Sequence, residues 1–409
     1  RYLVWTIAGE MLLFVAIVML AQQHSGALAF SVLQSSPPAP FVLLLLVTGF
    51  GIKLALPGLH LWLPQAYAVT PAPAVAVLSG AMLKAGLLGW LRFLPLGSTE
   101  LLHWGQVLLI AGITGIFFGA IAGLLQRSPR LLLGYSSISK VGVLTSGMGA
   151  ALVWPETAPV VIAAVVIYAA HHALVKGALF LGLGLVERSA VRPWTLAGLV
   201  FLALALAGAP LTSGALAKSI LTASLPQDAQ QLVMLLAVSA FATTLLMARF
   251  LFLVWRQRAR KYTPLPADPV IAWWMLLVVI AAYPFVLAQA AQLMANLVPV
   301  VLGITSSLLL LLAIRRGSLP TPTRARRVTQ GRPAPRTMQA MRQLANATQT
   351  VSGTLRVASQ SRFERVRQAV KQRLLRPHAP LNDAERWRLA GSLWLGIGGL
   401  LLSGFIFAI

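Results

Sequence analysis

Residues 51–93 read GIKLALPGLHLWLPQAYAVTPAPAVAVLSGAMLKAGLLGWLRF, and this stretch decides the fold. Its two lysines, Lys53 and Lys84, lie in largely apolar runs, and Pro57 with the following glycine interrupts the first run. Proline with glycine inside a membrane span frees backbone carbonyls and admits water. The stretch therefore predicts a broken transmembrane helix that carries a lysine, followed by a second span that carries another.

Apolar runs of similar length recur on both sides of this stretch. The mean hydropathy is +0.80 and 58% of the residues are hydrophobic, which excludes an ordinary soluble domain. The chain has no cysteine, which excludes disulfides, thiol chemistry and iron–sulfur ligation by its own side chains. We expect an all-α polytopic membrane protein with about eleven transmembrane helices, each able to cross a hydrocarbon core of roughly 30 Å. The expected spans are 2–22, 38–56, 73–94, 103–126, 131–151, 157–186, 194–225 (broken), 229–255, 269–294, 297–314 and 387–409.

The formal net charge of +24 would suggest nucleic acid as the partner of a soluble protein, but here the arginines serve as orientation markers. Loops on the cytoplasmic side of membrane proteins accumulate Lys and Arg. Every basic loop between the expected spans falls on one side, and the loops on the other side hold no Lys or Arg. We therefore expect no nucleic-acid partner and basic loops on the cytoplasmic side.

The composition divides the chain into four parts. Residues 337–376 combine apolar residues at helical spacing with many arginines, which predicts a lateral amphipathic helix on the membrane surface, with anionic lipids as its partner. A disordered loop is the alternative for this segment. The expected parts are a core at 1–256, additional transmembrane helices at 257–314, a basic linker with the lateral helix at 315–386, and a final transmembrane helix at 387–409.

Five of the seven lysines lie within apolar stretches. A lysine at mid-bilayer costs several kcal/mol, so it persists mainly where it faces a polar interior. Arginine cannot release its proton, whereas a desolvated lysine can, so lysine is the residue suited to reversible protonation. The alternative is that the lysines snorkel to an interface and the helix breaks are packing kinks. The five are Lys53, Lys84, Lys140, Lys176 and Lys218.

A second break and a histidine pair extend this pattern. Pro210 in GAPLTSGALAK precedes Lys218 much as Pro57 follows Lys53. In HHALVK, His172 and Lys176 are four residues apart and share a helix face, and a neutral histidine can both accept and donate a proton. His171, next to His172, is a further candidate for proton transfer. Zinc binding by His171 and His172 is a weak interpretation without cysteine or a nearby carboxylate, so we expect no metal.

The chain resembles the proton-conducting antiporter-like subunits of respiratory complex I. That family also includes the Mrp-type cation/proton antiporters and the membrane arms of energy-converting hydrogenases. The resemblance covers residues 1–256, and architecture alone extends it further. The matching strings are residues 51–93, RLLLGYSSISKVGVL, HHALVKGALFLGLG and GAPLTSGALAKSIL.

The resemblance implies two inverted repeats of five helices, each with one broken helix. It matches Lys53 to the lysine of the first broken helix and Lys84 to the connecting lysine. It matches His172 and Lys176 to the central relay, and Lys218 to the terminal lysine or glutamate of the second broken helix. A lateral helix before the last span is a feature of the subunit at the far end of such arms.

The chain departs from the family pattern at two places. The first five helices are absent, including the one whose glutamate partners the first lysine, so we expect a piece of a longer polypeptide or a second chain that supplies them. Glu10 is the acidic residue within an expected span and could substitute for that glutamate. Lys140 stands where the family often has a neutral residue, and could extend the relay.

The interior lysines together with the resemblance imply translocation of protons, or of Na⁺, by a subunit of a redox-driven pump similar to complex I, in an energy-transducing membrane such as the bacterial inner membrane. The chain shows no quinone, flavin or nucleotide motif, so we expect no cofactor of its own and redox chemistry in partner membrane subunits. The alternatives are an Mrp-type cation/proton antiporter subunit, a proton channel coupled to a CO₂-hydrating partner, and a structural subunit that no longer conducts.

Overall fold

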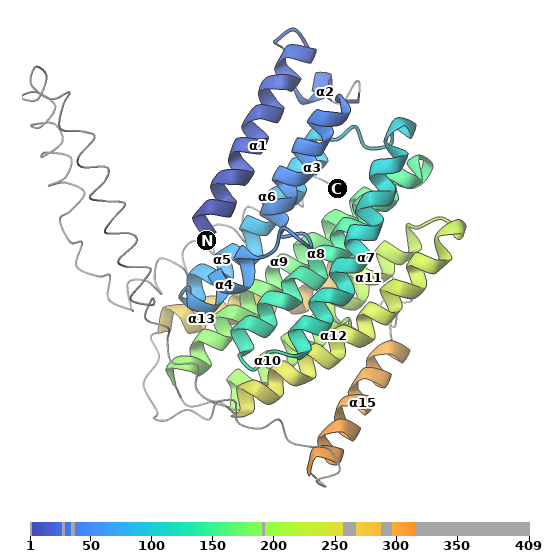
Figure 1. Ribbon diagram of the computed structural model, residues 1–409. Helices are drawn as coiled ribbons and strands as arrows, with labels where there is room; N and C mark the ends of the chain where they lie inside the picture. The colour runs from blue at the N-terminus through green and yellow to red at the C-terminus, as the bar shows by residue number, and fades with distance from the viewer. Residues whose placement is uncertain are drawn as a thin grey trace, which may run out of the picture. The chain divides into compact units, whose positions relative to one another are not determined.

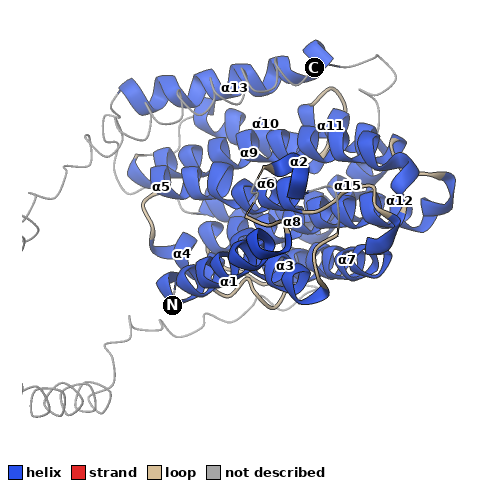
Figure 2. Ribbon diagram, turned by 90° about the horizontal axis from the view of Figure 1, so that it is seen from above, coloured by secondary structure: helices blue, strands red, loops and turns tan. Residues whose placement is uncertain are grey.

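The structure is a computed structural model that describes residues 2–26, 29–33, 37–189, 193–256, 267–287 and 297–315. All regular secondary structure in these ranges is helical, which confirms the expected all-α fold (Figures 1 and 2). Six of the described helical segments are long and apolar enough to cross a membrane, and three shorter apolar helices accompany them. The lateral helix and the final span at 387–409 lie outside the described residues.

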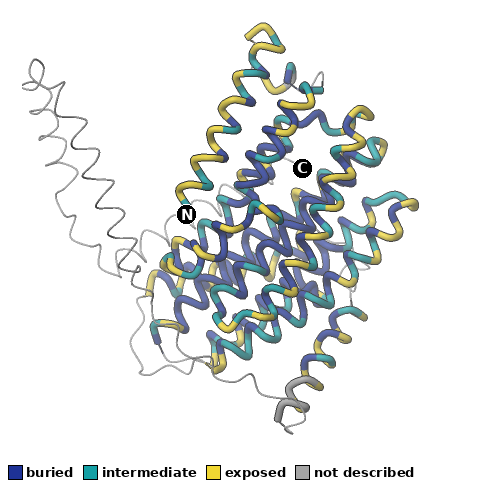
Figure 3. Tube along the Cα trace, viewed as in Figure 1, coloured by how far each residue is buried: buried dark blue, intermediate teal, exposed yellow. Residues whose placement is uncertain are grey.

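The N-terminal part comprises α1 (Tyr2–Gln23), α2 (Phe30–Leu33), α3 (Pro40–Leu54) and α4 (Trp62–Val69). Helices α1 and α3 pack closely because Gly49 has no side chain: a Cβ there would lie 2.7 Å from Leu13 Cγ. Much of the remaining surface of α1 is exposed (Figure 3). Its exposed residues include Leu3, Val4, Ile7, Met11 and Phe14.

The next span is continuous but not uniform. It consists of α5 (Ala72–Val77), a single π-helical turn, η1 (Leu78–Met82), and α6 (Leu83–Phe93). The sequence predicted a plain helix over 73–94. A π-turn departs from the regular i→i−4 hydrogen-bond ladder and is frequent at functional sites.

Three long helices form the centre: α7 (Leu102–Leu124), α8 (Pro129–Val153) and α9 (Ala158–Arg188). Small residues let α7 and α8 approach backbone to backbone, as at Gly142, where a Cβ would lie 2.5 Å from the Ile116 nitrogen. Helix α8 is absent from the six long apolar segments, yet nearly all its residues are buried. It is an interior helix that can carry polar side chains because neighbouring helices cover it.

The C-terminal part comprises α10 (Pro193–Ala207), α11 (Ser213–Ala223), α12 (Gln230–Arg256), α13 (Ala267–Leu287) and α15 (Leu297–Arg315). Helices α10 and α11 are the two halves of the second broken helix, and α3 and α4 flank the first break, so both predicted breaks are confirmed. Short 3₁₀ turns precede α7, α9 and α12, at Thr99–Leu101, Pro155–Thr157 and Gln227–Ala229.

One ion pair joins three of these elements near their ends. Arg130, in the first turn of α8, donates from Nε to Glu187 Oε1 at 2.8 Å and from Nη2 to Glu187 Oε2 at 2.5 Å. Its Nη1 donates to the carbonyl of Thr70, which caps α4. This two-pronged geometry suits arginine specifically and ties α8 and α9 to the segment after the first break.

Candidate functional site

At the first break, α3 ends in a left-handed cap at Ala55 (φ 58°), and the Leu56 N–H donates to the Gly51 carbonyl at 3.0 Å. Pro57 follows and cannot continue the helix. The buried indole of Trp62 donates from Nε1 to the Ile52 carbonyl at 2.8 Å. The broken end of α3 is therefore completed by the side chain of a tryptophan.

Because the indole binds the end of α3, the side chain of Lys53 is not needed there and can contact a different helix. Its Nζ lies 2.5 Å from Glu10 Oε1, so the structure joins the two residues across α1 and α3. The side chains are 27% and 50% exposed. The sequence named Glu10 as a candidate partner, and the structure places it in that position.

Lys84 follows the π-helical turn directly. Its Nζ donates to the carbonyl of Ser79, inside that turn, at 2.6 Å. Lys84 is half-buried, and its charge interacts with those of His172 and Lys176. The departure from regular helix thus lies at the point where this lysine binds the backbone.

The centre of the site lies between α8 and α9. Lys176 is fully buried and donates from Nζ to the Leu133 carbonyl of α8 at 2.7 Å. His172, one turn earlier on α9, is also fully buried, and neither ring nitrogen has a hydrogen-bond partner among the described residues. An imidazole in this situation can take up or release a proton without first breaking a hydrogen bond.

Lys140 lies on α8 and is 1% exposed. Its Nζ donates to Thr243 Oγ1 on α12 at 2.6 Å, and the Thr243 hydroxyl donates to the Ser239 carbonyl at 2.7 Å. The charge of Lys140 interacts with those of Lys176 and Lys218. Lys140 therefore lies between the central pair, His172 and Lys176, and the second broken helix.

At the second break, α10 ends at Ala207, and positive φ angles follow at Gly208 (88°) and Leu211 (62°) on either side of Pro210. Lys218 of α11 donates from Nζ to the Ala207 carbonyl at 2.9 Å, so the lysine itself completes the broken end. His171 Nδ1 lies 2.9 Å from Ser213 Oγ, at the start of α11.

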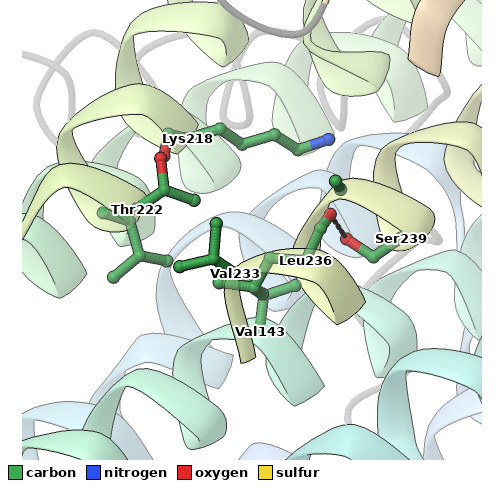
Figure 4. A pocket seen from close by; sticks show the side chains of 8 residues that line it. Val143, Lys218, Thr222, Val233, Leu236 and Ser239 are labelled. Carbon is green, nitrogen blue, oxygen red and sulfur yellow. Dashed lines mark hydrogen bonds between the residues drawn. The ribbon is translucent and has the colours of Figure 1, made fainter. Parts of the chain in front are cut away.

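A pocket of about 170 Å³ lies beside Lys218, between α8, α11 and α12. Figure 4 shows Lys218 along one side of the pocket, with Thr222 next to it and Ser239 contributed by α12. The pocket is otherwise apolar. The remaining lining residues are Val143, Leu221, Val233, Leu236 and Ala237.

The five predicted lysines thus lie on α3, α6, α8, α9 and α11. Lys53 has a carboxylate partner, whereas the other four have none among the described residues and bind backbone carbonyls or a hydroxyl instead. Sequence reasoning missed four features: the Trp62 bond, the π-turn, the Thr243 contact and the pairing of Glu187. Of these, only Trp62 had a signal, because it lies inside the H-x-W-L-P string beside the break.

Two interrupted helices and an interior line of basic residues, within a bundle of apolar helices, define an integral membrane protein of the antiporter-like class. The chain belongs to the family described as NADH:quinone oxidoreductase/Mrp antiporter, TM, which its residues 1–245 match. The family predicted from the lysine-bearing strings is therefore confirmed.

Curated relatives come from several kinds of complex. The chain is 35% identical over 185 residues to formate hydrogenlyase subunit 3 of Escherichia coli (strain K12), covering 43% of this chain and 30% of that protein. It is 33% identical over 233 residues to NADH-quinone oxidoreductase subunit N of Desulforudis audaxviator, covering 52% and 44%. It is 31% identical over 266 residues to a Na(+)/H(+) antiporter subunit of Alkalihalophilus pseudofirmus, covering 59% and 51%. The chain thus spans between about a third and half of the length of these relatives.

The fold also matches a solved structure. A chain of the Mrp complex from Dietzia sp. DQ12-45-1b aligns with a TM-score of 0.59 and 18% sequence identity, covering 76% of this chain and 68% of that one. At this identity the match establishes the shared fold.

Proposed function

We propose that this chain translocates protons across the membrane along its interior lysines, as one subunit of a larger membrane complex. The observation that carries the proposal is the arrangement of four interior lysines, Lys84, Lys140, Lys176 and Lys218. The charge of Lys176 interacts with those of Lys84 and Lys140, and the charge of Lys218 interacts with that of Lys140. None of the four has a carboxylate partner among the described residues. Fixed structural charges in low dielectric are normally paired, so unpaired lysines in this setting favour a role in which the charge is transient.

The path begins or ends at the Lys53–Glu10 pair. From there a proton passes to Lys84, to the His172 and Lys176 pair, to Lys140 and on to Lys218. Along this path each lysine alternates between ammonium and amine, as an N–H bond breaks at one group and another forms at the next, and water supplies or takes up the proton at the two ends. A charge on one lysine repels a charge on the next, so protonation at one end favours release at the other. The pocket beside Lys218 supports exchange of protons with water at that end.

Partners follow from the relatives by similarity. The curated relatives are named as subunits of a formate hydrogenlyase, an NADH-quinone oxidoreductase and a Na(+)/H(+) antiporter. We infer that this chain likewise works beside other membrane subunits. In a redox-driven complex those subunits hold the quinone or hydrogen chemistry, and this chain supplies the proton path.

The test is proton translocation by the whole complex in reconstituted vesicles. Lys218→Ala is expected to abolish translocation while leaving the complex assembled, and Lys218→Arg is expected to fail as well, because arginine keeps its proton. Lys261→Ala, in a basic loop predicted by the sequence, is the matched control and is expected to retain full rate. Normal translocation by Lys218→Ala would defeat the proposal.

The same vesicles separate the rival functions. Translocation that continues without sodium favours a proton pump, whereas a strict need for sodium favours a cation/proton antiporter. Mass spectrometry of the co-purifying subunits distinguishes redox partners from small membrane subunits or a zinc-bearing CO₂-hydrating partner.

Sidedness is part of the proposal, since it fixes which end faces the cytoplasm. The chain has no cysteine, so single-cysteine variants can be labelled without background. We expect Arg127→Cys to react with a membrane-impermeant reagent only from the cytoplasmic side, and Asp228→Cys only from the opposite side. The reverse pattern would invert the predicted orientation.

A further inference from the structure

We propose that Thr243 of α12 is a positioning residue for Lys140, and that its hydroxyl makes Lys140 the step that connects Lys176 with Lys218. This inference rests on the proposed function and deepens it, because it assigns a role to a residue outside the lysine and histidine set. It also explains how a lysine deep in α8 is held beside the second broken helix.

Lys140 differs from the other interior lysines in the chemistry of its contact. Lys84, Lys176 and Lys218 each donate to a backbone carbonyl, of Ser79, Leu133 and Ala207 respectively. A carbonyl only accepts hydrogen bonds, so it offers no hydrogen to the lone pair of a neutral amine. Lys140 instead binds a hydroxyl, which accepts from the ammonium and can rotate to donate to the amine. At this contact Lys140 can therefore donate as an ammonium and accept as an amine, whereas the amines of the other three lysines can only donate to their carbonyls.

Thr243 is itself held in a fixed orientation. It is 1% exposed, and its hydroxyl donates to the Ser239 carbonyl one turn earlier on α12. That bond fixes the oxygen with its acceptor side toward Lys140 whenever the lysine carries its proton. On loss of the proton, the hydroxyl hydrogen can leave the Ser239 carbonyl, whose backbone partners remain, and turn to the amine nitrogen. The exchange requires rotation about a single bond.

Thr243 also lies on the side of Lys140 that is nearer to the second broken helix. Ser239, which Thr243 contacts, lines the pocket beside Lys218, and α8 contributes Val143 to the same pocket. The charge of Lys218 interacts with that of Lys140, and the charge of Lys176 interacts with those of Lys84 and Lys140. The Thr243 contact draws the Lys140 ammonium toward α12, which is the side shared with Lys218. A proton leaving Lys176 thus meets an amine already oriented toward the terminal lysine.

The test uses isosteric changes in the intact complex. Thr243→Val keeps the shape and removes the hydroxyl, and we expect the translocation rate to fall on the order of tenfold, as for loss of one hydrogen bond to a charged group. Thr243→Ser keeps the hydroxyl and is expected to stay near the wild-type rate. Thr244→Val is the matched control, because Thr244 is buried on the same helix and its hydroxyl donates only within α12, to the Ala240 carbonyl at 2.9 Å.

A double variant shows whether Thr243 acts through Lys140. In the Lys140→Gln background, Thr243→Val is expected to cause no further loss, since the partner has already been removed. An unchanged rate in Thr243→Val, an equal loss in Thr244→Val, or an additive loss in the double variant would each overturn the inference. If Lys218→Ala is inactive while Thr243→Val is normal, only this inference fails. If Lys218→Ala translocates normally, the proposed function itself fails.

Discussion

The two broken helices have similar backbones and opposite chemistry. Each break contains a glycine with positive φ, Gly58 (85°) and Gly208 (88°), and a larger residue in the same region of φ, Ala55 and Leu211. At the first break the Trp62 indole binds the Ile52 carbonyl, which also accepts from the Ala55 N–H at 3.1 Å. At the second, the terminal ammonium of a lysine binds the Ala207 carbonyl. With similar backbones at the two breaks, Lys53 can thus pair with a carboxylate, whereas Lys218 binds the backbone.

The consequence is a difference in how each lysine is held when it carries charge. Lys53 has a full counter-ion in Glu10, in a partly exposed position. Lys218 is 6% exposed and has only a carbonyl dipole. The first break therefore holds its lysine through a carboxylate and the second through a backbone carbonyl. Substitutions at the two breaks can test this asymmetry, beginning with the largest expected effect.

Gly214→Ala should have the largest effect, because it acts on the packing that holds the second break together. A Cβ at this position would lie 1.8 Å from the Ala205 carbonyl oxygen of α10, which is a severe clash. Overpacking typically costs about 1–3 kcal/mol, and a clash with backbone belongs at the upper end of that range. We expect a sharp fall in the yield of folded complex on size-exclusion chromatography. Normal yield and thermal stability would show that α10 and α11 can separate at little cost.

Trp62→Phe tests the cap of the first break. It removes the indole donor from the buried Ile52 carbonyl, which keeps only the Ala55 N–H of the left-handed cap at 3.1 Å, at an expected cost of about 0.5–1.5 kcal/mol in the free energy of unfolding. Trp273→Phe is the matched control: its Nε1 donates to the Ala178 carbonyl at 2.9 Å, within the regular ladder of α9. Thermal denaturation in detergent should show the larger loss for Trp62→Phe. Equal losses would mean that both result from lost ring volume.

Glu10→Gln removes the counter-ion of Lys53 and keeps the shape of the side chain. The lysine at the first break then lacks a carboxylate partner, as Lys218 does at the second. Because both side chains of this pair are partly exposed, we expect a modest effect, on the order of a tenfold slower translocation with assembly intact. Glu187→Gln breaks the Arg130–Glu187 ion pair and is the control, since that pair includes none of the five interior lysines. A larger loss of rate in Glu187→Gln would indicate that the helix ends, rather than the Lys53 charge, limit transport.

The sequence predicts the spans, both breaks and the five lysines because each depends on residue type and local order. Apolar runs require helices in a membrane, and Pro57 and Pro210 require interruptions. The partners of the lysines depend on how distant helices pack, and no local pattern carries that information. Thr243 lies in an apolar helix where a threonine carries no distinctive signal, and Ser79 contributes only its carbonyl. Glu10 could be named because an acidic residue within a span is rare in itself.

Gly208→Ala and Gly58→Ala form the finest test of the asymmetry. Both glycines have positive φ, so alanine should cost each variant a similar backbone strain of about 1–2 kcal/mol. At Gly58 a Cβ would meet nothing within 4 Å, whereas at Gly208 it would lie 3.3 Å from Lys218 Nζ and 3.2 Å from Cδ. Displacing a side chain from its rotamer costs about 0.5–1.5 kcal/mol. Gly208→Ala should therefore slow translocation severalfold, in addition to any effect of the backbone strain that both variants share. Thermal denaturation should therefore shift in both variants, somewhat more in Gly208→Ala, while only Gly208→Ala loses rate. Equal rates would mean that Lys218 does not depend on its contact with the broken end of α10, and the distinction between the two breaks would then rest on Glu10 alone.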